Sequence, residues 1–368
     1  MTERKRVAIV FGGASSEHAI SCLTAASVAK AIDTEKYEVV GIGITPTGRW
    51  VRFGSGAMAA LTMQGDTLPA VGEDAPEAVL LKSGTGGQVA TRADGALAEL
   101  GEIDVAFALL HGPFGEDGTI QGLFEMNGIP YVGSGVLASA VGMDKNYMKL
   151  VLSASGIPIG PFVTITPREW ESDRGACLES INALTFPVYV KPARGGSSVG
   201  ITKVADPVDL PKAIEFARRY DPKVIIEQGL VDARELECGV LETPAGPRAS
   251  VVAEIRVHSS TGMYDFATKY LPGDQVDIDV PAQLPPEDTA RVQELSLKVF
   301  GALGCEGLAR VDFFLTAEGR LICNEINTMP GFTATSMYPQ LWAASGVPYP
   351  EVIDTLIQQA LDRRPGLR

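Results

Sequence analysis

Residues 191–200 read KPARGGSSVG, and this stretch decides how the middle of the chain folds. Its three glycines let backbone N–H groups approach an anion closely, its two serines add hydroxyl donors, and Lys191 supplies a positive charge. Apolar residues on either side, at 187–190 and 201–204, predict the two strands of a hairpin with a long tip. Residues 224–227 predict a further short strand.

The tip of this hairpin has two interpretations. Gly195 and Gly200 have the spacing of a P-loop, but Ile201 and Thr202 stand where that motif requires Lys followed by Ser or Thr. The stretch is therefore not a Walker motif. It is either a phosphate-binding loop of another kind or a flexible surface loop.

A second set of polar residues lies on two predicted strands near the C-terminus. Arg310 and Asp312 fall in one strand, and Glu325 and Asn327 fall at the end of the next. Because side chains alternate along a strand, each pair lies on one face. If the strands pair, three oxygen ligands converge, as Mg²⁺ shared with substrate phosphates requires. The alternative is a structural salt bridge from Arg310 to one of the carboxylates.

Composition excludes several classes of partner. The chain has 368 residues and a net charge of −14, from 31 Lys and Arg against 45 Asp and Glu. This balance, without a basic run, argues against nucleic acid and against an anionic membrane surface. No stretch approaches the roughly 20 apolar residues of a membrane span, and the first apolar run is too short for a signal peptide. A cytoplasmic location is expected.

The cysteines support the same expectation. They are scattered, odd in number and include no C-x-x-C pair: Cys22, Cys177, Cys238, Cys305 and Cys323. This pattern predicts reduced, mostly buried thiols and gives no support for a zinc site.

The length predicts two or three domains. Apolar strands at 7–11, 37–44 and 103–110, with a helix capped by Ser15 or Ser16, predict an N-terminal α/β domain with a parallel sheet. Residues 54–96 are interpreted as irregular or edge structure, and one helix is expected over 139–154. The C-terminal part is expected to have α+β character, with strands at 235–241, 251–257, 308–315 and 321–324 and helices at 286–303 and 349–362.

Three further segments carry a resemblance to a known family. Residues 11–21 read FGGASSEHAIS, residues 111–122 read HGPFGEDGTIQG and residues 327–333 read NTMPGFT. Together with the two sets above, these ordered motifs resemble the ATP-grasp superfamily and, within it, the D-alanine–D-alanine ligases. The resemblance implies three domains: an N-terminal α/β domain at 1–137, a central domain with the phosphate loop at 138–228, and a C-terminal domain with the metal site at 229–368.

The resemblance also implies how ATP would be held. The implied contacts are Lys145, Lys191, Ser197 and Ser198 to phosphates, Lys269 to the γ-phosphate, Glu227 with backbone groups of Gln228 and Leu230 to adenine, and Glu235 to the ribose. Asp312, Glu325 and Asn327 would bind two Mg²⁺ ions, with Mn²⁺ as a substitute. Many relatives carry Lys where this chain has Gln228, so only its backbone role is carried over.

The amino-acid site is implied in the same way. The implied roles are Glu17 with the ammonium of the first D-alanine near His111, Arg310 and the Gly331 backbone with the oxyanion, and Ser336 with the carboxylate of the second D-alanine. Tyr270 would hydrogen-bond to Ser197 and, through it, to Glu17. Residues 263–275 are the predicted lid, because a reactive acyl phosphate has to be shielded from water.

The implied reaction is the ATP-dependent ligation of two D-alanines through an acyl phosphate, for peptidoglycan precursor synthesis, in a homodimer. Three alternatives stay open: another ATP-grasp carboxylate–amine ligase, a D-alanine–D-lactate ligase, and a nucleotide-binding protein without activity. Tyr270 favours D-alanine over D-lactate as the second substrate.

Overall fold

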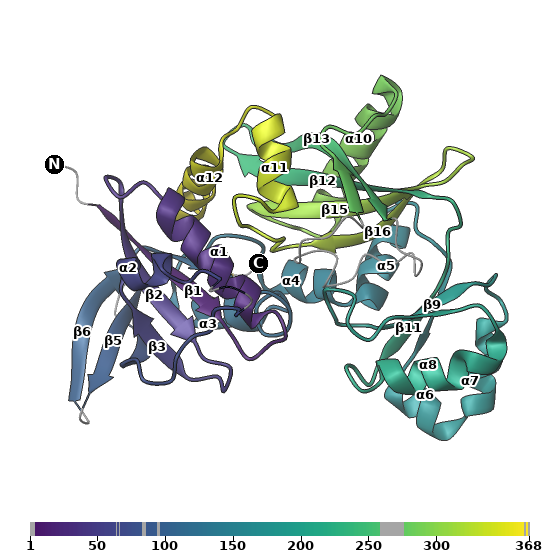
Figure 1. Cartoon of the computed structure of the whole chain (residues 1–368), viewed down its shortest axis with the longest axis horizontal. Coiled ribbons are helices and arrows are strands. Elements are labelled where there is room, and N and C mark those ends of the chain that lie inside the picture. Colours follow the sequence, from purple (N-terminus) through teal and green to yellow (C-terminus); the bar gives the residue numbers. More distant parts are fainter. Residues whose placement is uncertain are drawn as a thin grey trace.

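The computed structural model describes residues 4–63, 65, 67–82, 86–93, 96–257, 276–363 and 366. Three sheets follow one another along the chain, with helices packed on their faces (Figure 1). The fold is mixed α/β, as predicted. Within the described ranges no helix has both the length and the apolar character needed to cross a membrane.

The N-terminal sheet has seven strands in the order β6-β5-β4-β3-β2-β1-β7. They are β1 (Lys5–Gly12), β2 (Tyr37–Ile44), β3 (Trp50–Phe53), β4 (Glu77–Lys82), β5 (Gly87–Ala93), β6 (Ala96–Ile103) and β7 (Val105–Ala108). The pairs β1–β2 and β1–β7 are parallel, whereas each successive pair from β2 to β6 is antiparallel. The prediction of a parallel sheet was thus wrong for the outer half.

Short connections explain this antiparallel half. Residues 45–49 alone join β2 to β3, whereas a parallel crossover needs about a dozen residues or more. The stretch 54–96, predicted as irregular or edge structure, contains α2 (Ser55–Ala59), β4, β5 and the start of β6. That prediction was wrong for most of the stretch, because β4 and β5 lie inside the sheet and only the first residue of the border strand β6 falls within it.

The first helix, α1 (His18–Ala31), begins later than its predicted caps. Its N-cap position is held by Glu17, whose side chain makes no capping hydrogen bond. Ser15 Oγ instead accepts from the Glu17 N–H at 3.2 Å and donates to the His111 carbonyl at 3.0 Å. The carboxylate of Glu17 is therefore free of a capping role at this helix.

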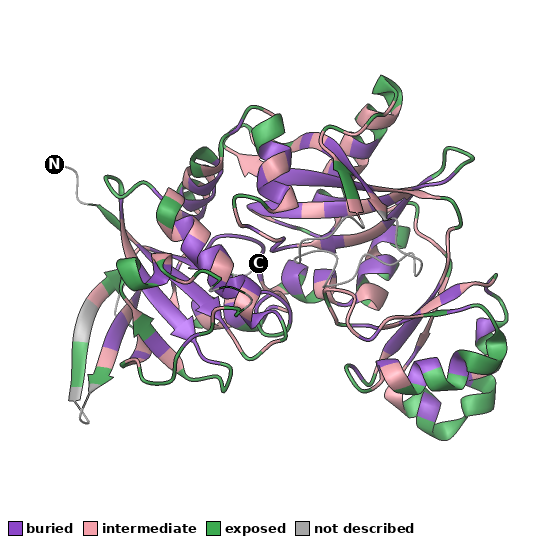
Figure 2. Ribbon diagram, viewed as in Figure 1, coloured by how far each residue is buried: buried purple, intermediate pink, exposed green. Residues whose placement is uncertain are grey.

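The central sheet has four antiparallel strands in the order β10-β9-β11-β8. They are β8 (Phe162–Ile165), β9 (Val188–Pro192), β10 (Thr202–Val204) and β11 (Val224–Gln228). The predicted hairpin is present as β9 and β10, with Val190 opposite Thr202. The helices α6 (Pro167–Ser172), α7 (Arg174–Ile181) and α8 (Leu210–Ala217) cover it and turn exposed faces outward (Figure 2).

The C-terminal sheet has five antiparallel strands in the order β14-β13-β12-β15-β16. They are β12 (Arg234–Thr243), β13 (Gly246–Val257), β14 (Val276–Asp279), β15 (Leu308–Leu315) and β16 (Leu321–Asn327). On one face α10 (Pro286–Ala302) shares a core with strand residues such as Leu236 and Val311. On the other face lie α11 (Met337–Ala344) and α12 (Tyr349–Asp362).

The last helix joins the first and third sheets. Leu356 of α12 belongs to the same buried cluster as Val7 and Phe107 of the N-terminal sheet. The Tyr37 hydroxyl donates to Asp354 Oδ1 at 2.7 Å. Burial of this shared apolar surface, the main favourable term in folding, places the two sheets side by side.

The helix predicted over 139–154 is broken in two. It consists of α4 (Val136–Met143) and α5 (Lys145–Ala154), and Asp144 between them has an extended conformation. The Asp144 carboxylate accepts hydrogen bonds from the N–H groups of Asn146 and Tyr147, which caps α5. An aspartate that caps one helix interrupts the preceding one. The break places Lys145 in the first turn of α5.

Candidate active site

The phosphate loop (residues 191–200) leaves β9 and turns back into β10. Ser197 and Ser198 both have a left-handed backbone, with φ of 49° and 58°. Residues other than glycine rarely adopt such angles, and each instance costs on the order of 1 kcal/mol or more. Two successive serines in this conformation indicate a loop whose shape is imposed by contacts around it.

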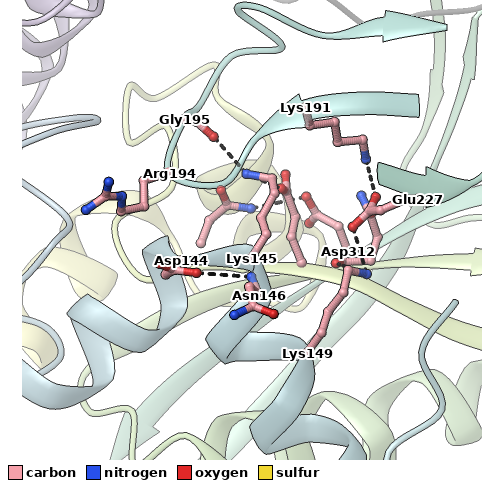
Figure 3. A network of polar contacts seen from close by, with 12 residues as sticks. Asp144, Lys145, Asn146, Lys149, Lys191, Arg194, Gly195, Glu227 and Asp312 are labelled. Atoms are coloured by element: carbon pink, nitrogen blue, oxygen red, sulfur yellow. Dashed lines mark hydrogen bonds and ion pairs between the residues drawn. The ribbon is translucent and has the colours of Figure 1, made fainter. Parts of the chain in front are cut away.

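Lys145 and Asp221 hold the first half of the loop. The Lys145 N–H donates to the Ala193 carbonyl at 3.0 Å, and its ammonium donates to the Gly195 carbonyl at 2.8 Å (Figure 3). Arg194 donates twice to the buried Asp221 carboxylate, at 2.9 and 2.8 Å. These attachments distinguish the loop from the flexible surface loop of the alternative interpretation.

Glu17 brings the N-terminal part of the chain against the loop. The Ser197 hydroxyl donates to Glu17 Oε1 at 2.5 Å. A Cβ atom on Gly112 would lie 2.7 Å from Glu17 Oε2, and one on Gly196 would lie 3.1 Å from it. A side chain at either position would therefore displace the Glu17 carboxylate from where it lies, and Gly112 also has a left-handed φ of 75°.

His111 and Glu116, from the segment after β7, hold the backbone of Met329. His111 Nδ1 lies 3.1 Å from the Met329 carbonyl oxygen, so Nδ1 carries the proton. Burial lowers the pKa of His111, although the nearby Glu17 charge opposes this shift. Glu116 accepts from the Gly112 N–H at 2.7 Å and forms a hydrogen bond with the Met329 backbone.

Glu116 should make the stability of the fold depend on pH. Burial, and then the charge of Glu17, raise the pKa of Glu116 from 4.5 to about 8. The protonated carboxyl therefore stabilises the fold fully below about pH 4.5, and this contribution is lost as the pH rises through about 8. Glutamine does not titrate, so Glu116→Gln should gain stability relative to wild type between about pH 5 and pH 8.

Urea unfolding at a series of pH values, without nucleotide or Mg²⁺, measures this difference. Free energies of unfolding for wild type and Glu116→Gln that change in parallel with pH would show that the Glu116 carboxyl titrates at an ordinary pKa.

The carboxylate cluster (Arg310, Asp312, Glu325 and Asn327) lies where β15 pairs with β16. Asp312 is opposite Glu325, and two residues along, on the same face, Arg310 is opposite Asn327. Arg310 donates to both oxygens of Asp312, at 2.8 and 2.7 Å, and pairs with Glu237 of β12 at 2.9 Å. Burial alone would lower the pKa of Arg310, but these two carboxylates raise it well above its ordinary value. Asp312 and Glu325 thus face each other, and the salt bridge of the alternative interpretation is also present.

The cluster fits a hard cation that takes its other ligands from a phosphate. Mg²⁺ is commonly held by one or two carboxylates together with substrate oxygens. Over the ranges that the structure describes, no group of three or more His, Cys, Asp and Glu side chains is arranged to hold a metal. Asp312 and Glu325 lie opposite each other, and Asn327 Nδ2 donates to Asp312 at 3.1 Å, which leaves its amide oxygen for a further partner.

The residues expected to hold adenine and phosphate meet in a buried ion cluster. Glu227 Oε2 lies 2.5 Å from the Lys191 ammonium, and Oε1 lies 3.0 Å from Lys149 on α5 (Figure 3). The Gln228 N–H already donates to the Pro161 carbonyl at 3.0 Å. The N–H group of Gln228 is therefore already used within the protein.

Two cavities meet at Arg310 and Gly331. The smaller, of about 80 Å³, is lined by both and by Glu17, His111 and Ser197. The larger, of about 450 Å³, is also lined by both and contains Ser336, whose hydroxyl lies 2.7 Å from Thr333 Oγ1. The residues predicted to bind two amino acids thus line adjoining spaces, with the expected oxyanion groups between them.

The remaining predicted residues divide into two groups. Leu230 follows β11, and Glu235 is the second residue of β12. Lys269, Tyr270 and the predicted lid over 263–275 lie outside the described residues.

Three side chains of this site were not predicted from the sequence. Glu116 stands inside a quoted motif, and Lys149 lies one helical turn after Lys145, so both could have been found. Glu237 could not have been found, because its role depends on β12 pairing with β15, where it lies opposite Asp312.

Comparison with protein families gives two matches that together cover most of the chain. Residues 6–134 match the model of the D-ala D-ala ligase N-terminus, and residues 151–358 match the model of the D-ala D-ala ligase C-terminus. Relatives named D-alanine–D-alanine ligase include that of Pseudarthrobacter chlorophenolicus, 52% identical over 369 residues, with 99% of this chain and 96% of the relative covered. That of Nocardia farcinica is 52% identical over 371 residues, with both chains fully covered.

Solved structures agree with these sequence matches. The D-alanine–D-alanine ligase from Coxiella burnetii superposes with a TM-score of 0.81 at 32% identity, covering 98% of this chain and 95% of that one. The VanG D-Ala:D-Ser ligase from Enterococcus faecalis also has a TM-score of 0.81, at 35% identity, with coverage of 97% and 100%. The family models, the full-length relatives and the fold all agree, so the chain belongs to the D-alanine–D-alanine ligase family.

Proposed function

We propose that this chain uses ATP to join two D-alanines into D-alanyl-D-alanine, a precursor for peptidoglycan. The observation that carries the proposal is the smaller cavity, which Glu17 and His111 line from the N-terminal part, Lys145 and Ser197 from the central part and Arg310 from the C-terminal sheet. An ammonium partner, phosphate ligands and an oxyanion partner therefore surround one space.

In the proposed reaction, the carboxylate of the first D-alanine attacks the γ-phosphorus of ATP and forms an acyl phosphate, while the bond to the bridging oxygen breaks and ADP leaves. Glu17 holds its ammonium group beside His111, which orients the carboxylate towards the phosphate loop. The amine of the second D-alanine, with its carboxylate at Ser336, then attacks the acyl carbon, and phosphate leaves. Arg310 and the Gly331 N–H stabilise the oxyanion that forms between the two cavities.

ATP is proposed to lie along the central and C-terminal sheets. The proposed contacts are Lys145, Lys191, Ser197, Ser198 and Lys269 to phosphates, Glu227, Gln228 and Leu230 to adenine, and Glu235 to the ribose. Two Mg²⁺ ions, for which Mn²⁺ substitutes, would be held by Asp312, Glu325 and Asn327. Bound there, they would neutralise charge on the phosphates during transfer.

Phosphate release from ATP with and without D-alanine tests this proposal. We expect release to require D-alanine and to match dipeptide formation in amount. D-serine and D-lactate should be offered as competing acceptors, because the similar VanG enzyme is a D-Ala:D-Ser ligase. ATP hydrolysis that ignores all three acceptors, or a main product other than the dialanine, would contradict the proposal.

Tyr270 is proposed to select an amine over a hydroxy acid. Before it attacks, D-alanine has to lose an ammonium proton, which a hydroxyl network reaching Glu17 through Ser197 can accept. Tyr270→Phe should keep ATP use but let D-lactate compete, most strongly at low pH where D-alanine stays protonated. The measurement is the ratio of ester to dipeptide against pH with both acceptors present, and an unchanged ratio would exclude this role.

None of the five cysteines should be needed for turnover. All are free and buried, and burial raises their pKa values, to about 12 for Cys22, Cys305 and Cys323. A protonated thiol is a poor nucleophile, and the proposed chemistry uses none. Single Cys→Ala variants should therefore retain dipeptide synthesis, measured on protein whose folding is checked by circular dichroism. Inactivation of a variant that stays folded would contradict this prediction.

We also propose the three-domain ATP-grasp arrangement at 1–137, 138–228 and 229–368. Support comes from the three separate sheets, each contained within one of these ranges. The homodimer remains a prediction, which sedimentation velocity would test, and so does the cytoplasmic location. Nucleic acid is not expected among the partners of a chain with a net charge of −14.

A further inference from the structure

Lys149 is a buried lysine to which the reaction above gives no role. Its side chain is 3% exposed, and it projects from α5 one turn after Lys145. Its ammonium lies 3.0 Å from Glu227 Oε1 and donates to the Asn324 carbonyl of β16 at 3.5 Å. A charged group buried this deeply is costly unless it is paired, so the contact with Glu227 is what allows it to stay.

Glu227 is held between two cations. Lys149 approaches one carboxylate oxygen and Lys191 the other, from opposite sides (Figure 3). Burial alone would raise the pKa of Glu227, but the charges of Lys149 and Lys191 outweigh it and lower the pKa to about 2. The carboxylate is therefore ionised at neutral pH and fixed in place.

The two lysines differ in what else they can reach. Lys191 stands at the end of β9, where the phosphate loop begins, and its side chain is 13% exposed. It is the one proposed to bind the phosphates of ATP. Lys149 is more deeply buried and tied to β16 as well. When a phosphate draws the Lys191 ammonium away, Glu227 would remain buried with one oxygen lacking its cation, while the same carboxylate has to hold adenine.

We propose that Lys149 is a positioning residue for ATP binding. Its ammonium group stays paired with Glu227 when the ammonium group of Lys191 moves from Glu227 to the phosphates. Glu227 thereby remains charged and oriented towards adenine. The inference rests on the proposed use of ATP. It explains why two lysines surround one carboxylate, because Lys191 has to leave Glu227 in order to bind the phosphates.

The inference predicts that Lys149 matters for ATP and not for adenosine. Adenosine has no phosphate to compete for Lys191, so Glu227 keeps one lysine whether or not Lys149 is present. Lys149→Met leaves an unbranched apolar side chain, one atom shorter than that of lysine, and removes the charge. This variant should bind ATP about one to two orders of magnitude more weakly, as expected when a buried charge loses its partner, and bind adenosine as wild type does.

Competition against a fluorescent nucleotide, with Mg²⁺ present, measures both affinities on the full chain. Lys298→Met is the matched control, because it removes one lysine from the exposed face of α10. Equal weakening of ATP binding and adenosine binding would show that Lys149 has only a structural role. Unchanged ATP binding would show that Lys149 does not contribute to nucleotide binding. Either result overturns the inference.

A double-mutant cycle with Glu227→Gln gives a second test. Without a charge at position 227 no counter-ion is needed, so Lys149→Met added to Glu227→Gln should lower ATP affinity no further. This comparison also holds if Lys149→Met alone fails to fold, because the double variant leaves no carboxylate unpaired. A further loss in the double variant would overturn the inference. Dipeptide synthesis by wild type, assayed separately, distinguishes a failure here from a failure of the proposed function.

Discussion

Lys191→Ala is expected to lower kcat/KM for ATP by about 10³-fold, the loss typical of removing a preorganised group that stabilises transition-state charge. The lysine is the last residue but one of β9, at the start of the phosphate loop, and its partner in the structure is the Glu227 carboxylate at 2.5 Å. In the variant, Glu227 still has Lys149 at 3.0 Å, so the ion cluster is not left as a lone carboxylate. The protein should therefore fold, and the loss should be one of chemistry and nucleotide binding.

Steady-state kinetics with ATP as the varied substrate and D-alanine at saturation measure this effect. Lys203→Ala is the control, because Lys203 is exposed on the neighbouring strand β10, where it pairs with Tyr189. Circular dichroism and thermal unfolding confirm that each variant is folded. A folded Lys191→Ala variant with near-normal dipeptide synthesis would contradict the phosphate role of the loop.

Glu325→Gln should raise the Mg²⁺ concentration needed for half-maximal activity by about tenfold or more, because it removes an anionic ligand and keeps the side-chain shape. Glu325 is better suited to this test than Asp312. Both oxygens of Asp312 accept from the buried Arg310 guanidinium, so changing Asp312 would also remove a partner of that charge. Glu325 lies directly across the ladder, 3.6 Å from the Lys145 ammonium.

A Mg²⁺ titration of turnover at fixed ATP gives the result, repeated with Mn²⁺ to test whether that ion substitutes. Glu318→Gln is the matched control, since Glu318 lies in the turn between β15 and β16 with a side chain 69% exposed. Superimposable titrations of wild type and Glu325→Gln would mean that the cluster is a structural salt bridge. The Arg310–Asp312 pair would then account for its presence.

The strands were predictable where apolar runs are long and uninterrupted. The run at 7–11 lies within β1, and the strand at 308–315 and the helix at 349–362 have the predicted bounds. The break at Asp144 was missed because the apolar pattern continues through it, and only the hydrogen bonds of its carboxylate to Asn146 and Tyr147 show that a second helix starts there. The outer half of the first sheet was missed because residues 54–96 lack a strong apolar period.

The sequence predicted which residue types form the site better than it predicted which of these residues contact one another. Period-two alternation placed Asp312 and Glu325 on the correct faces, and antiparallel pairing brings them opposite each other. The position of Glu17 against Ser197 could not be derived in that way, because they are 180 residues apart and meet only when the first and second sheets are assembled.

The sequence by itself determined the chemistry: a glycine- and serine-rich loop after a lysine, two carboxylates on adjoining strands, and motifs that place the chain among the D-alanine–D-alanine ligases. These signals are local, since each depends on residue type and on spacing within one or two strands. Only the tertiary structure decided which charges pair. The resemblance assigns Lys191 and Glu227 to separate parts of ATP, yet they bind each other, and Lys149 completes the cluster from the helix α5. Pairing of buried charges depends on distances between elements that packing sets, and no periodicity along the chain encodes those distances.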